Sequence, residues 1–526
     1  MGNAQTFVFA AFLCLAVSAF ALITVPSRGG DTLNGFILAR RRLKQRSIVA
    51  SLTGTNAALA NVVFLYAYWG FTYGAAGLVW GGIFWIAGLT VFLAALRFGR
   101  LKSLLRADQP ALGLNEILGG EFRRSRTVVR ATALASGLTF LFLLSLEVGV
   151  GSNAAIRLVS ETPAASFGFS PEALIVGGAL VILVSTYGYV GGFPMVVRTD
   201  VWQTLLILAG LFSALALCGV LLNNAGTALG TVLSTHLRHD RLFSWTWELA
   251  PFVLGSLFSW GVWFLCTMDS WQRALAADPA EERRLRPAAI VAGMVLLVFV
   301  SGISSIIGMT VHEIWSASAP PAYPVIEFVG YIKQLTTASE LNGFLVALVM
   351  AGFLAAMAST VDTYMVVVGH CFGGDLWNRE SLSSYVGTEN ERPVLARIRT
   401  IGIIAPLVGL AGFALIHTLG RQDNFTLYML AGSIPMSLLP VCAWSIWRSN
   451  VTSVPDGRIT AVGILVAVAS SMLVNYLVAG HALSTFDARF FGLLYFIPAF
   501  TAAIAAIFLV ADIRLTSIDT GQGAQE

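Results

Sequence analysis

The stretch GFLAAMASTVDTYMVVVGH, residues 352–370, is apolar enough to cross a membrane, yet oxygen-bearing side chains lie near its middle. These are Ser359, Thr360, Asp362 and Thr363, and on a helix they share an arc of about 160°. A carboxylate at mid-membrane costs about 2.5–3.5 kcal/mol on insertion scales, so it needs a partner. Oxygen ligands with no His or Cys nearby suit a hard cation. A packing face between helices is the alternative.

A second polar group lies in the apolar span 48–72, where Gly54 and Asn56 stand near the middle. Glycine beside an amide side chain is typical of an interrupted membrane helix, whose freed carbonyl groups bind a cation or a solute. An ordinary close-packed helix is the alternative. This pattern therefore indicates a second contributor to a polar site in the membrane.

Glu147 lies deep in a third span, within FLFLLSLEVGVGSNAAI. A glutamate at that depth must be protonated or have a cation, a polar neighbour or a cavity beside it. A structural ion pair with Arg157 is an alternative, but that arginine is ten residues on, near the end of the span. We expect Glu147 to face a central cavity.

The elements that must position these residues are membrane helices. The chain has 526 residues, 56% of them hydrophobic and 11% charged, whereas soluble domains carry about 25% charged residues. Only helices or closed barrels satisfy the backbone in lipid, and the apolar runs are too long for strands. We predict an all-α, polytopic membrane protein of about 13 transmembrane helices. Their ranges are 5–25, 48–72, 74–97, 131–158, 171–190, 200–222, 249–270, 287–311, 340–371, 396–418, 425–447, 459–480 and 488–511.

The distribution of Lys and Arg predicts the orientation. With the N-terminus outside, most of the 32 Lys and Arg residues fall on the inner side, above all in ARRRLKQR and in the segment 97–130. The C-terminus is then cytoplasmic. The net charge of +4 needs no nucleic-acid partner, because the basic residues lie where membrane insertion favours them. MGNAQTF has no positive n-region, so the first span is expected to stay as a helix rather than be cleaved as a signal peptide.

The sequence motifs give little support for an enzyme. The five cysteines stand singly, without a CxxC pair, and the chain has no GxxxxGK[ST] phosphate loop and no GxSxG motif. HEIWS at His312 lacks the second histidine of a metalloprotease motif. We therefore do not expect an enzyme, although a membrane enzyme remains a minor alternative.

Four separated stretches together resemble the sodium/solute symporter family. STYGYVGGFPMVVRTDVWQ (185–203) is similar to its double-glycine turn and TD-x-x-Q helix start, and 255–284 to its helix ending in QR-x-x-AA-D. AAMASTVDTYMVVVGHCFGGDLW (355–377) is similar to its small-residue helix with adjacent hydroxyls, and 48–72 occupies the place of its broken first core helix. The resemblance covers roughly residues 35–450, and the four motifs come in the family's order and spacing.

The resemblance implies a LeuT-type fold with two inverted repeats of five helices. These would be 48–222 and 249–447, preceded by one extra helix at 5–25 and followed by two extra helices within 459–511 and a short cytoplasmic tail at 512–526. Inverted repeats must begin on opposite sides of the membrane, and the charge-based orientation gives them that relation.

The resemblance also implies cation sites. The family's main sodium site falls on Ser359 and Thr360, with carbonyl ligands from Gly54 and Ala57. A second cation site, found in some members, falls on Asp200, Asp362 and Thr363. This chain departs from the family at Asp362, where serine is general, and at Gly188 and Met195. An acid beside the cation site raises proton coupling as an alternative.

The same alignment places Asn61, Glu147 and Trp260 at the edge of a central cavity, with Tyr66 and Trp263 as aromatic walls. Each has packing as an alternative, which we favour for Trp263. A fixed carboxylate at Glu147 favours a solute that carries an amine or several hydroxyl groups.

The resemblance thus implies a secondary active transporter that couples Na⁺, with H⁺ as an alternative, to the import of a small polar organic solute by alternating access. No organic cofactor and no obligatory protein partner are expected. The protein would be a monomer or a homodimer in the lipid bilayer of the plasma membrane, the bacterial inner membrane. A transporter-like solute sensor without efficient transport is the alternative from another class.

Overall fold

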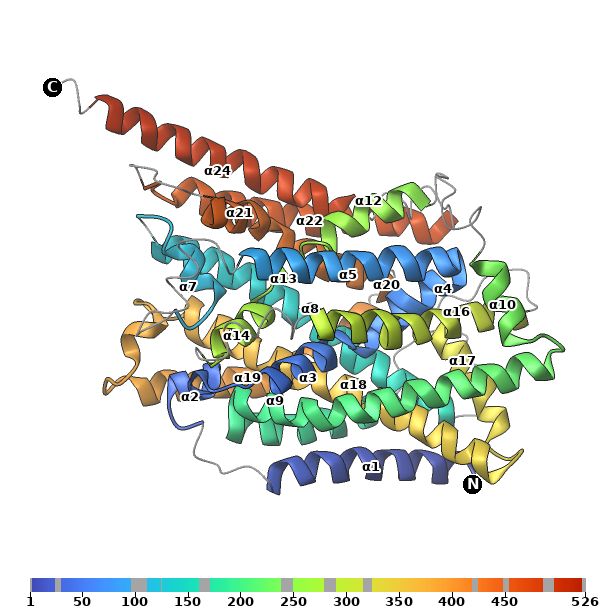
Figure 1. Ribbon diagram of the computed structural model, residues 1–526. Helices are drawn as coiled ribbons and strands as arrows, with labels where there is room; N and C mark the ends of the chain where they lie inside the picture. Colours follow the sequence, from blue (N-terminus) through green and yellow to red (C-terminus); the bar gives the residue numbers. More distant parts are fainter. Residues whose placement is uncertain are drawn as a thin grey trace.

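The computed structural model is all-helical over the residues that it describes, and its long helices lie roughly side by side (Figure 1). The described residues are 2–23, 30–95, 111–123, 125–159, 171–237, 249–278, 290–315, 324–418, 424–447, 454–485 and 496–522. The longer helices are α1 (Asn3–Ile23), α3 (Gln45–Asn56), α5 (Ala75–Ala95), α8 (Ser125–Val159), α9 (Pro171–Asn224), α12 (Leu249–Ser259), α16 (Gly302–Ile314), α17 (Pro324–Leu335), α18 (Glu340–Val368), α19 (Glu391–Thr418), α20 (Asn424–Ser433), α22 (Arg458–Thr485) and α24 (Ile497–Gln522). The shorter ones are α2 (Leu33–Leu38), η2 (Ala39–Arg41), η3 (Asn61–Ala67), α4 (Tyr68–Tyr73), α7 (Leu114–Gly119), α10 (Leu229–His236), α13 (Trp263–Cys266), α14 (Met268–Ala276), η5 (Leu296–Ser301), η6 (Gly369–Leu376), η7 (Leu382–Tyr385), η8 (Ile434–Leu438) and α21 (Leu439–Trp447).

Ten helices in the described part are long and apolar enough to cross a membrane, or eleven if one bent pair counts as a span, so the chain is a multi-pass membrane protein. The predicted number of thirteen is not confirmed. Two of the predicted spans, 171–190 and 200–222, lie on either side of a break in α9 at Gly192 (φ 58°, ψ −153°), two residues before Pro194. The predicted span 48–72 is broken into pieces that are each too short to count.

Parts of several predictions lie outside the described residues. These are the end of span 5–25, the starts of spans 287–311 and 488–511, residues 97–110 and 124 of the basic segment 97–130, the end of motif 255–284 and the last residues of the tail.

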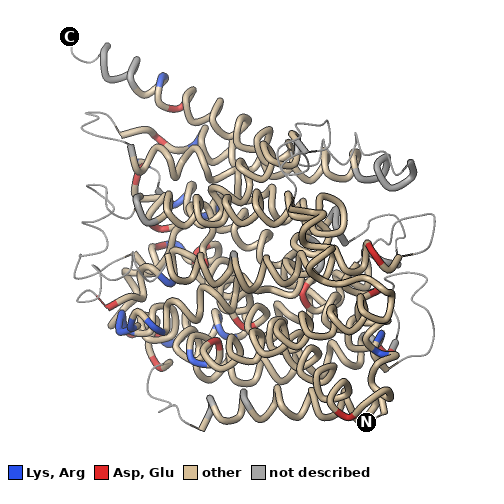
Figure 2. The backbone as a smooth tube through the Cα atoms, turned by 45° about the vertical axis from the view of Figure 1, so that its right-hand side comes forward, with Lys and Arg blue, Asp and Glu red and all other residues tan. Residues whose placement is uncertain are grey.

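The two described ends of the chain lie at opposite ends of the helix stack. In Figure 1, α1 begins at the right, while α24 ends at the left, beyond α2 and α7. In Figure 2, the Lys and Arg positions, coloured blue on the backbone tube, lie mainly on the left.

Two of the longest helices, α9 and α18, approach each other closely. A Cβ atom built on Gly210 of α9 would lie 2.9 Å from the Cα atom of Gly352 in α18, and one built on Gly352 would lie 3.0 Å from the Cα atom of Gly210. Small residues at such a crossing allow the two backbones to touch, which is how membrane helices gain dispersion contacts. At this crossing, the face of α18 that carries Ser359 packs against α9.

The start of α18 is defined by its sequence. Ser339 is the N-cap, and its side chain accepts a hydrogen bond from the backbone N–H of Asn342 at 3.1 Å. Glu340 follows in the first turn, where a negative charge complements the helix dipole. From there α18 runs without interruption to Val368, so its polar residues are held on one rigid element.

Candidate functional site

The predicted interruption of the span 48–72 is present in the structure. Helix α3 ends at Asn56, and Ala57 and Ala58 follow outside the regular helix before a π-helical stretch, η3, begins at Asn61. The N–H of Ala57 still bonds to the carbonyl of Thr53, at 2.8 Å. Within the described residues, no backbone N–H at the break donates to the carbonyl oxygens of Gly54 and Ala57. Those two oxygens are thus left for another partner.

Glu147 of α8 binds the other side of this break. Its two carboxylate oxygens accept hydrogen bonds from the backbone N–H groups of Leu59, at 3.1 Å, and Ala60, at 2.9 Å. These amides begin the second half of the broken helix, where the helix dipole is positive and free N–H groups are expected. Glu147 is 1% exposed. Its carboxylate therefore compensates for the break itself.

The oxygen-bearing face of α18 is turned toward α3 and α9. The hydroxyl of Ser359 donates to Oδ1 of Asp200 in α9 at 2.5 Å, and the hydroxyl of Ser51 in α3 donates to Oδ2 of the same carboxylate at 2.5 Å. A Cβ atom built on Gly54 would lie 2.9 Å from Oγ of Ser359, so the break region and α18 are in direct contact. Asp200 and Ser359 are fully buried.

Thr360 is fully buried beside Ser359 and donates its hydroxyl proton to the carbonyl of Ala356, one turn earlier in α18, at 2.8 Å. The oxygen keeps lone pairs for an acceptor role. Of the four residues of the predicted main cation site, Ser359 and Thr360 are thus adjacent on α18, Ser359 lies against Gly54 of α3, and Ala57 follows directly after α3. Carbonyl and hydroxyl oxygens of this kind suit a hard monovalent or divalent cation.

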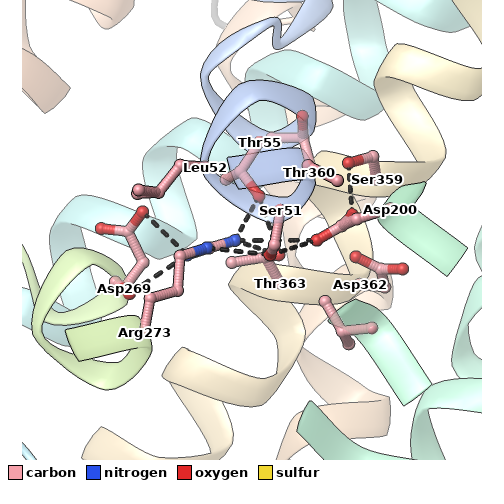
Figure 3. Close-up of polar contacts among 12 residues, drawn as sticks. Ser51, Leu52, Thr55, Asp200, Asp269, Arg273, Ser359, Thr360, Asp362 and Thr363 are labelled. Atoms are coloured by element: carbon pink, nitrogen blue, oxygen red, sulfur yellow. Dashed lines mark hydrogen bonds and ion pairs between the residues drawn. The ribbon is translucent and has the colours of Figure 1, made fainter. Parts of the chain in front are cut away.

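Thr363 lies one turn beyond Thr360 and faces a guanidinium group. Its hydroxyl is 3.2 Å from that of Thr55, and Nη2 of Arg273 donates to Thr363 Oγ1 at 3.2 Å. Arg273 also donates through Nε to Ser51 at 2.9 Å, and its Nη2 bonds to Thr55. Figure 3 shows the guanidinium between Asp269 on one side and Asp200 on the other.

Arg273 was missed by the sequence analysis, although it is the arginine of the QR motif. It is 1% exposed, with Nη2 at 3.9 Å from Asp200 Oδ2 and Nη1 at 3.3 Å from Asp269 Oδ2. A short bridge holds the end of α14 against the start of α3, because Leu43 and Ala277 pair in parallel. A buried cation in this position compensates part of the negative charge of the site.

Asp362 lies further along the same face and pairs with α9. Its Oδ2 accepts hydrogen bonds from the hydroxyls of Tyr187 at 2.9 Å and Thr199 at 3.2 Å, while its Oδ1 is buried with no partner. The predicted second cation site therefore consists of two parts in this structure. Asp200 and Thr363 are in contact with Arg273, and Asp362 has one unpaired oxygen (Figure 3).

A second broken helix borders the same region and was predicted only as one span, 249–270. Helix α12 ends at Ser259, α13 runs from Trp263 to Cys266, and α14 follows at an angle of 41°. Thr267 between α13 and α14 has an extended backbone (φ −110°, ψ 133°). Gly261 within the first gap is the one local signal in the sequence.

A small pocket lies between the two broken helices. Thr55, Asn56 and Asn61 of the first, and Trp260, Trp263 and Asp269 of the second, line it. The space between the side chains is small and holds about one water molecule. Asn61 connects two walls, because its Oδ1 accepts from the hydroxyl of Tyr428 at 2.5 Å and its Nδ2 donates to the carbonyl of Asn56 at 2.9 Å.

Of the five predicted solute contacts, the structure places three at this pocket: Asn61, Trp260 and Trp263. Glu147 and Tyr66 are not among the residues that line it. Glu147 is occupied by the amides of the break, and the ring of Tyr66 lies against that of Trp69, with centroids 6.1 Å apart.

No protein-family model matches the chain. The chain is 24% identical over 418 residues to the sodium/sialic acid symporter SiaT of Proteus mirabilis (strain HI4320), covering 77% of this chain and 78% of that protein. It is 21% identical over 312 residues to the sodium/sialic acid symporter NanT of Aliivibrio fischeri (strain ATCC 700601 / ES114), covering 57% and 59%.

Solved structures share the fold. A substrate-bound, outward-open Na⁺-coupled sialic acid symporter superposes with a TM-score of 0.68 at 15% identity, covering 96% of this chain and 97% of that chain. The nucleobase-cation-symport-1 transporter Mhp1, closed with bromovinylhydantoin bound, gives 0.52 at 13% identity, covering 94% and 96%. MhsT in complex with L-phenylalanine gives 0.51 at 15% identity, covering 90% and 99%. The chain therefore has the LeuT-type transporter fold that the resemblance implied.

Proposed function

We propose that this protein is a sodium-coupled secondary transporter that imports a small polar organic solute. The observation that carries the proposal is the contact between the break in α3 and the hydroxyl face of α18. There Gly54 lies against Ser359, the neighbour of Thr360 on α18, and within the described residues no backbone N–H at the break donates to the carbonyl oxygens of Gly54 and Ala57. The similarity to two sodium/sialic acid symporters supports the coupling ion, and at 24% and 21% identity it leaves the solute open.

The mechanism follows from where the oxygens come from. Two of the proposed ligands belong to the backbone of the broken helix and two to side chains of α18, so a bound cation would add a link between elements that also touch at Gly54 and Thr55. Occupancy would stabilise the arrangement that exposes the pocket to the outside, and solute binding would then be followed by rocking of the helix bundle. Each ligand must raise the affinity for the other, typically by about 1–3 kcal/mol of coupling free energy.

Removal of the two hydroxyls tests this proposal. Ser359→Ala and Thr360→Ala, each in purified protein reconstituted into liposomes, should abolish sodium-stimulated solute uptake while the protein stays folded. Melting temperature measured without Na⁺ reports folding. An unchanged dependence of uptake on Na⁺ in both variants would refute the cation assignment.

Proton coupling is the second candidate, and it has an observation of its own. Oδ1 of Asp362 is fully buried and has no hydrogen-bond partner, which a carboxylate tolerates poorly and a protonated carboxyl group tolerates better. Asp362→Asn imitates the protonated form. If protons are coupled, this variant should change the pH dependence of uptake or the charge moved per solute, and an identical flux per charge would remove Asp362 from the mechanism.

The orientation belongs to the proposal as well. The gathering of Lys and Arg at the end of the bundle that carries α2 and α7 supports a cytoplasmic location for that end (Figure 2). The N-terminus would then lie outside and the C-terminus inside, in the plasma membrane. The division into inverted repeats, 48–222 and 249–447, also stays part of the proposal.

A further inference from the structure

The pocket between the broken helices is lined mainly by aromatic rings. They are Trp85, Phe140, Trp260, Trp263, Tyr364 and Tyr428. Trp260 is at the centre of one group, with its ring centroid 5.9 Å from that of Trp85, 5.4 Å from Trp263 and 5.5 Å from Tyr428. Phe140 and Tyr364 form a second group, 5.0 Å apart. The faces of such rings carry negative charge density and attract a cation, most strongly when it is shielded from water.

Among the described residues that line the pocket, Asp269 is the one charged side chain. Its Oδ2 is engaged by Nη1 of Arg273 at 3.3 Å, and its Oδ1 has only the hydroxyl of Ser270 at 3.5 Å. A long bond of this kind contributes little. One carboxylate oxygen of Asp269 is therefore left for a donor or a cation in the pocket.

The surroundings of the pocket carry an excess of negative charge. Beside the pocket, the buried carboxyl groups of Asp200 and Asp269 both pair with the single guanidinium of Arg273, within the described part of the chain. With both acids ionised, this cluster carries one negative charge more than Arg273 neutralises. An anionic solute would add to that imbalance, whereas a cationic solute would reduce it.

Two donors in the pocket wall lack an acceptor. The indole N–H groups of Trp85 and Trp260 are buried and make no hydrogen bond, although both rings line the pocket. A buried donor without a partner is unfavourable, so an oxygen atom on the solute would stabilise it. The solute should thus combine a positive charge with a hydroxyl or carbonyl oxygen.

From these features we infer that the solute is a compact organic cation, an amine or quaternary ammonium compound bearing an oxygen acceptor, rather than an acidic sugar. This rests on the proposed symport, because it names the substrate class of that same pocket. The aromatic rings would surround the cationic group, Asp269 would pair with it, and the indole N–H groups would donate to its oxygen. The pocket holds about one water molecule in this structure, so it must widen to admit such a solute.

The test compares matched probes on the full-length protein in detergent or nanodiscs. Choline and ethanolamine are the cationic probes, 3,3-dimethylbutan-1-ol is the uncharged counterpart of choline with the same shape, and N-acetylneuraminate is the acidic sugar. Thermal stabilisation is measured for each probe in NaCl and in KCl. We expect choline or ethanolamine to stabilise in NaCl at concentrations at least about tenfold lower than the neutral counterpart.

Two pocket variants and two surface controls complete the design. Asp269→Asn and Trp260→Leu should each weaken binding of the cationic probe about tenfold or more, and Trp260→Phe should retain part of the affinity because it keeps an aromatic face. Asp456→Asn and Trp377→Leu change exposed residues and should leave the affinity unaltered. Circular dichroism confirms that each variant is folded, and the Trp260 pair replaces Asp269→Asn if that variant fails to fold.

The outcomes separate the two proposals. If Na⁺ stabilises the protein but the cationic probes do not, or if choline and its neutral counterpart act alike, the substrate class is refuted and symport stands. Preference for N-acetylneuraminate refutes it equally. If cationic probes bind identically in NaCl and KCl, the substrate class is supported while sodium coupling fails.

Discussion

Adding one methyl group at Gly54 should damage the cation site more than it damages the fold. The Cβ atom of Gly54→Ala would lie 2.9 Å from Oγ of Ser359 and 2.9 Å from Oγ1 of Thr204, on two different helices. Both distances are shorter than a carbon–oxygen contact allows, so one hydroxyl must move or α3 must shift. The simplest relief is rotation of Ser359 away from Asp200, which ends their 2.5 Å hydrogen bond.

The magnitude follows from that bond. A hydrogen bond to a charged group contributes about 1.5–3 kcal/mol. If Ser359 must return to its place for a cation to bind, the affinity for Na⁺ should fall about 10- to 100-fold. At a Na⁺ concentration of about 100 times the wild-type Kd, the ion stabilises the folded protein by about 2.7 kcal/mol, and a tenfold weaker site gives about 1.4 kcal/mol.

The assay is a thermal-unfolding series of purified protein against Na⁺ concentration, with K⁺ to hold ionic strength constant. Gly219→Ala is the matched control, because a Cβ atom at Gly219 of α9 meets no heavy atom within 4 Å. It should show the wild-type Na⁺ dependence and no loss of stability. If Gly54→Ala also keeps the wild-type Na⁺ midpoint, the ion does not bind at the contact between α3 and Ser359.

Three further predictions concern the groups around the site. Glu147→Gln replaces one of the two acceptors for Leu59 and Ala60 by a donor, so it should lower the unfolding free energy by about 1–3 kcal/mol. Melting curves that match those of the wild type would contradict the capping role. Arg273→Gln should lower the unfolding free energy by about 3–5 kcal/mol. Na⁺ should then stabilise the variant more than it stabilises the wild type, because the ion supplies positive charge beside Asp200. An unchanged stabilisation by Na⁺ in differential scanning fluorimetry would disprove this. Burial, followed by the charge of Asp375, raises the pKa of Glu116 in α7 above its ordinary value of 4.5. The stability that this group contributes is therefore full below pH 4.5 and is lost as pH rises through the higher folded-state pKa. Glu116→Gln should flatten that part of the profile of unfolding free energy against pH, and a profile parallel to the wild type would show that Glu116 does not titrate there.

The main features of the site could be predicted where they depend on local sequence. The hydroxyls of 359–363 share one helix face because the helical period places them there, and an amide beside Gly54 in an apolar span is enough to indicate a break. Composition and apolar run length were sufficient for the all-α membrane class.

The rest depends on contacts between distant segments. The depth of Glu147 was visible in the sequence, but its partners are the amides of a break 88 and 87 residues earlier. Arg273 lies just beyond the predicted span 249–270, and nothing in its neighbourhood reveals that α14 lies at 41° to α12–α13 and is tied to the start of α3 by the pairing of Leu43 with Ala277. The sharp turn at Gly192, by contrast, falls between the two predicted spans 171–190 and 200–222, where the sequence has a glycine pair and a proline.

The crossing of α9 and α18 at Gly210 and Gly352 has a consequence for the transport cycle. Because Gly210 and Gly352 are in backbone contact, we expect the two helices to move as one rigid unit, with the distance between Asp200 and Ser359 unchanged. Opening must then occur at the interrupted segment around Ala57. The hydroxyl ligands on α18 would keep their positions while the backbone carbonyl ligands at the break move away, and the bound ion would then be released.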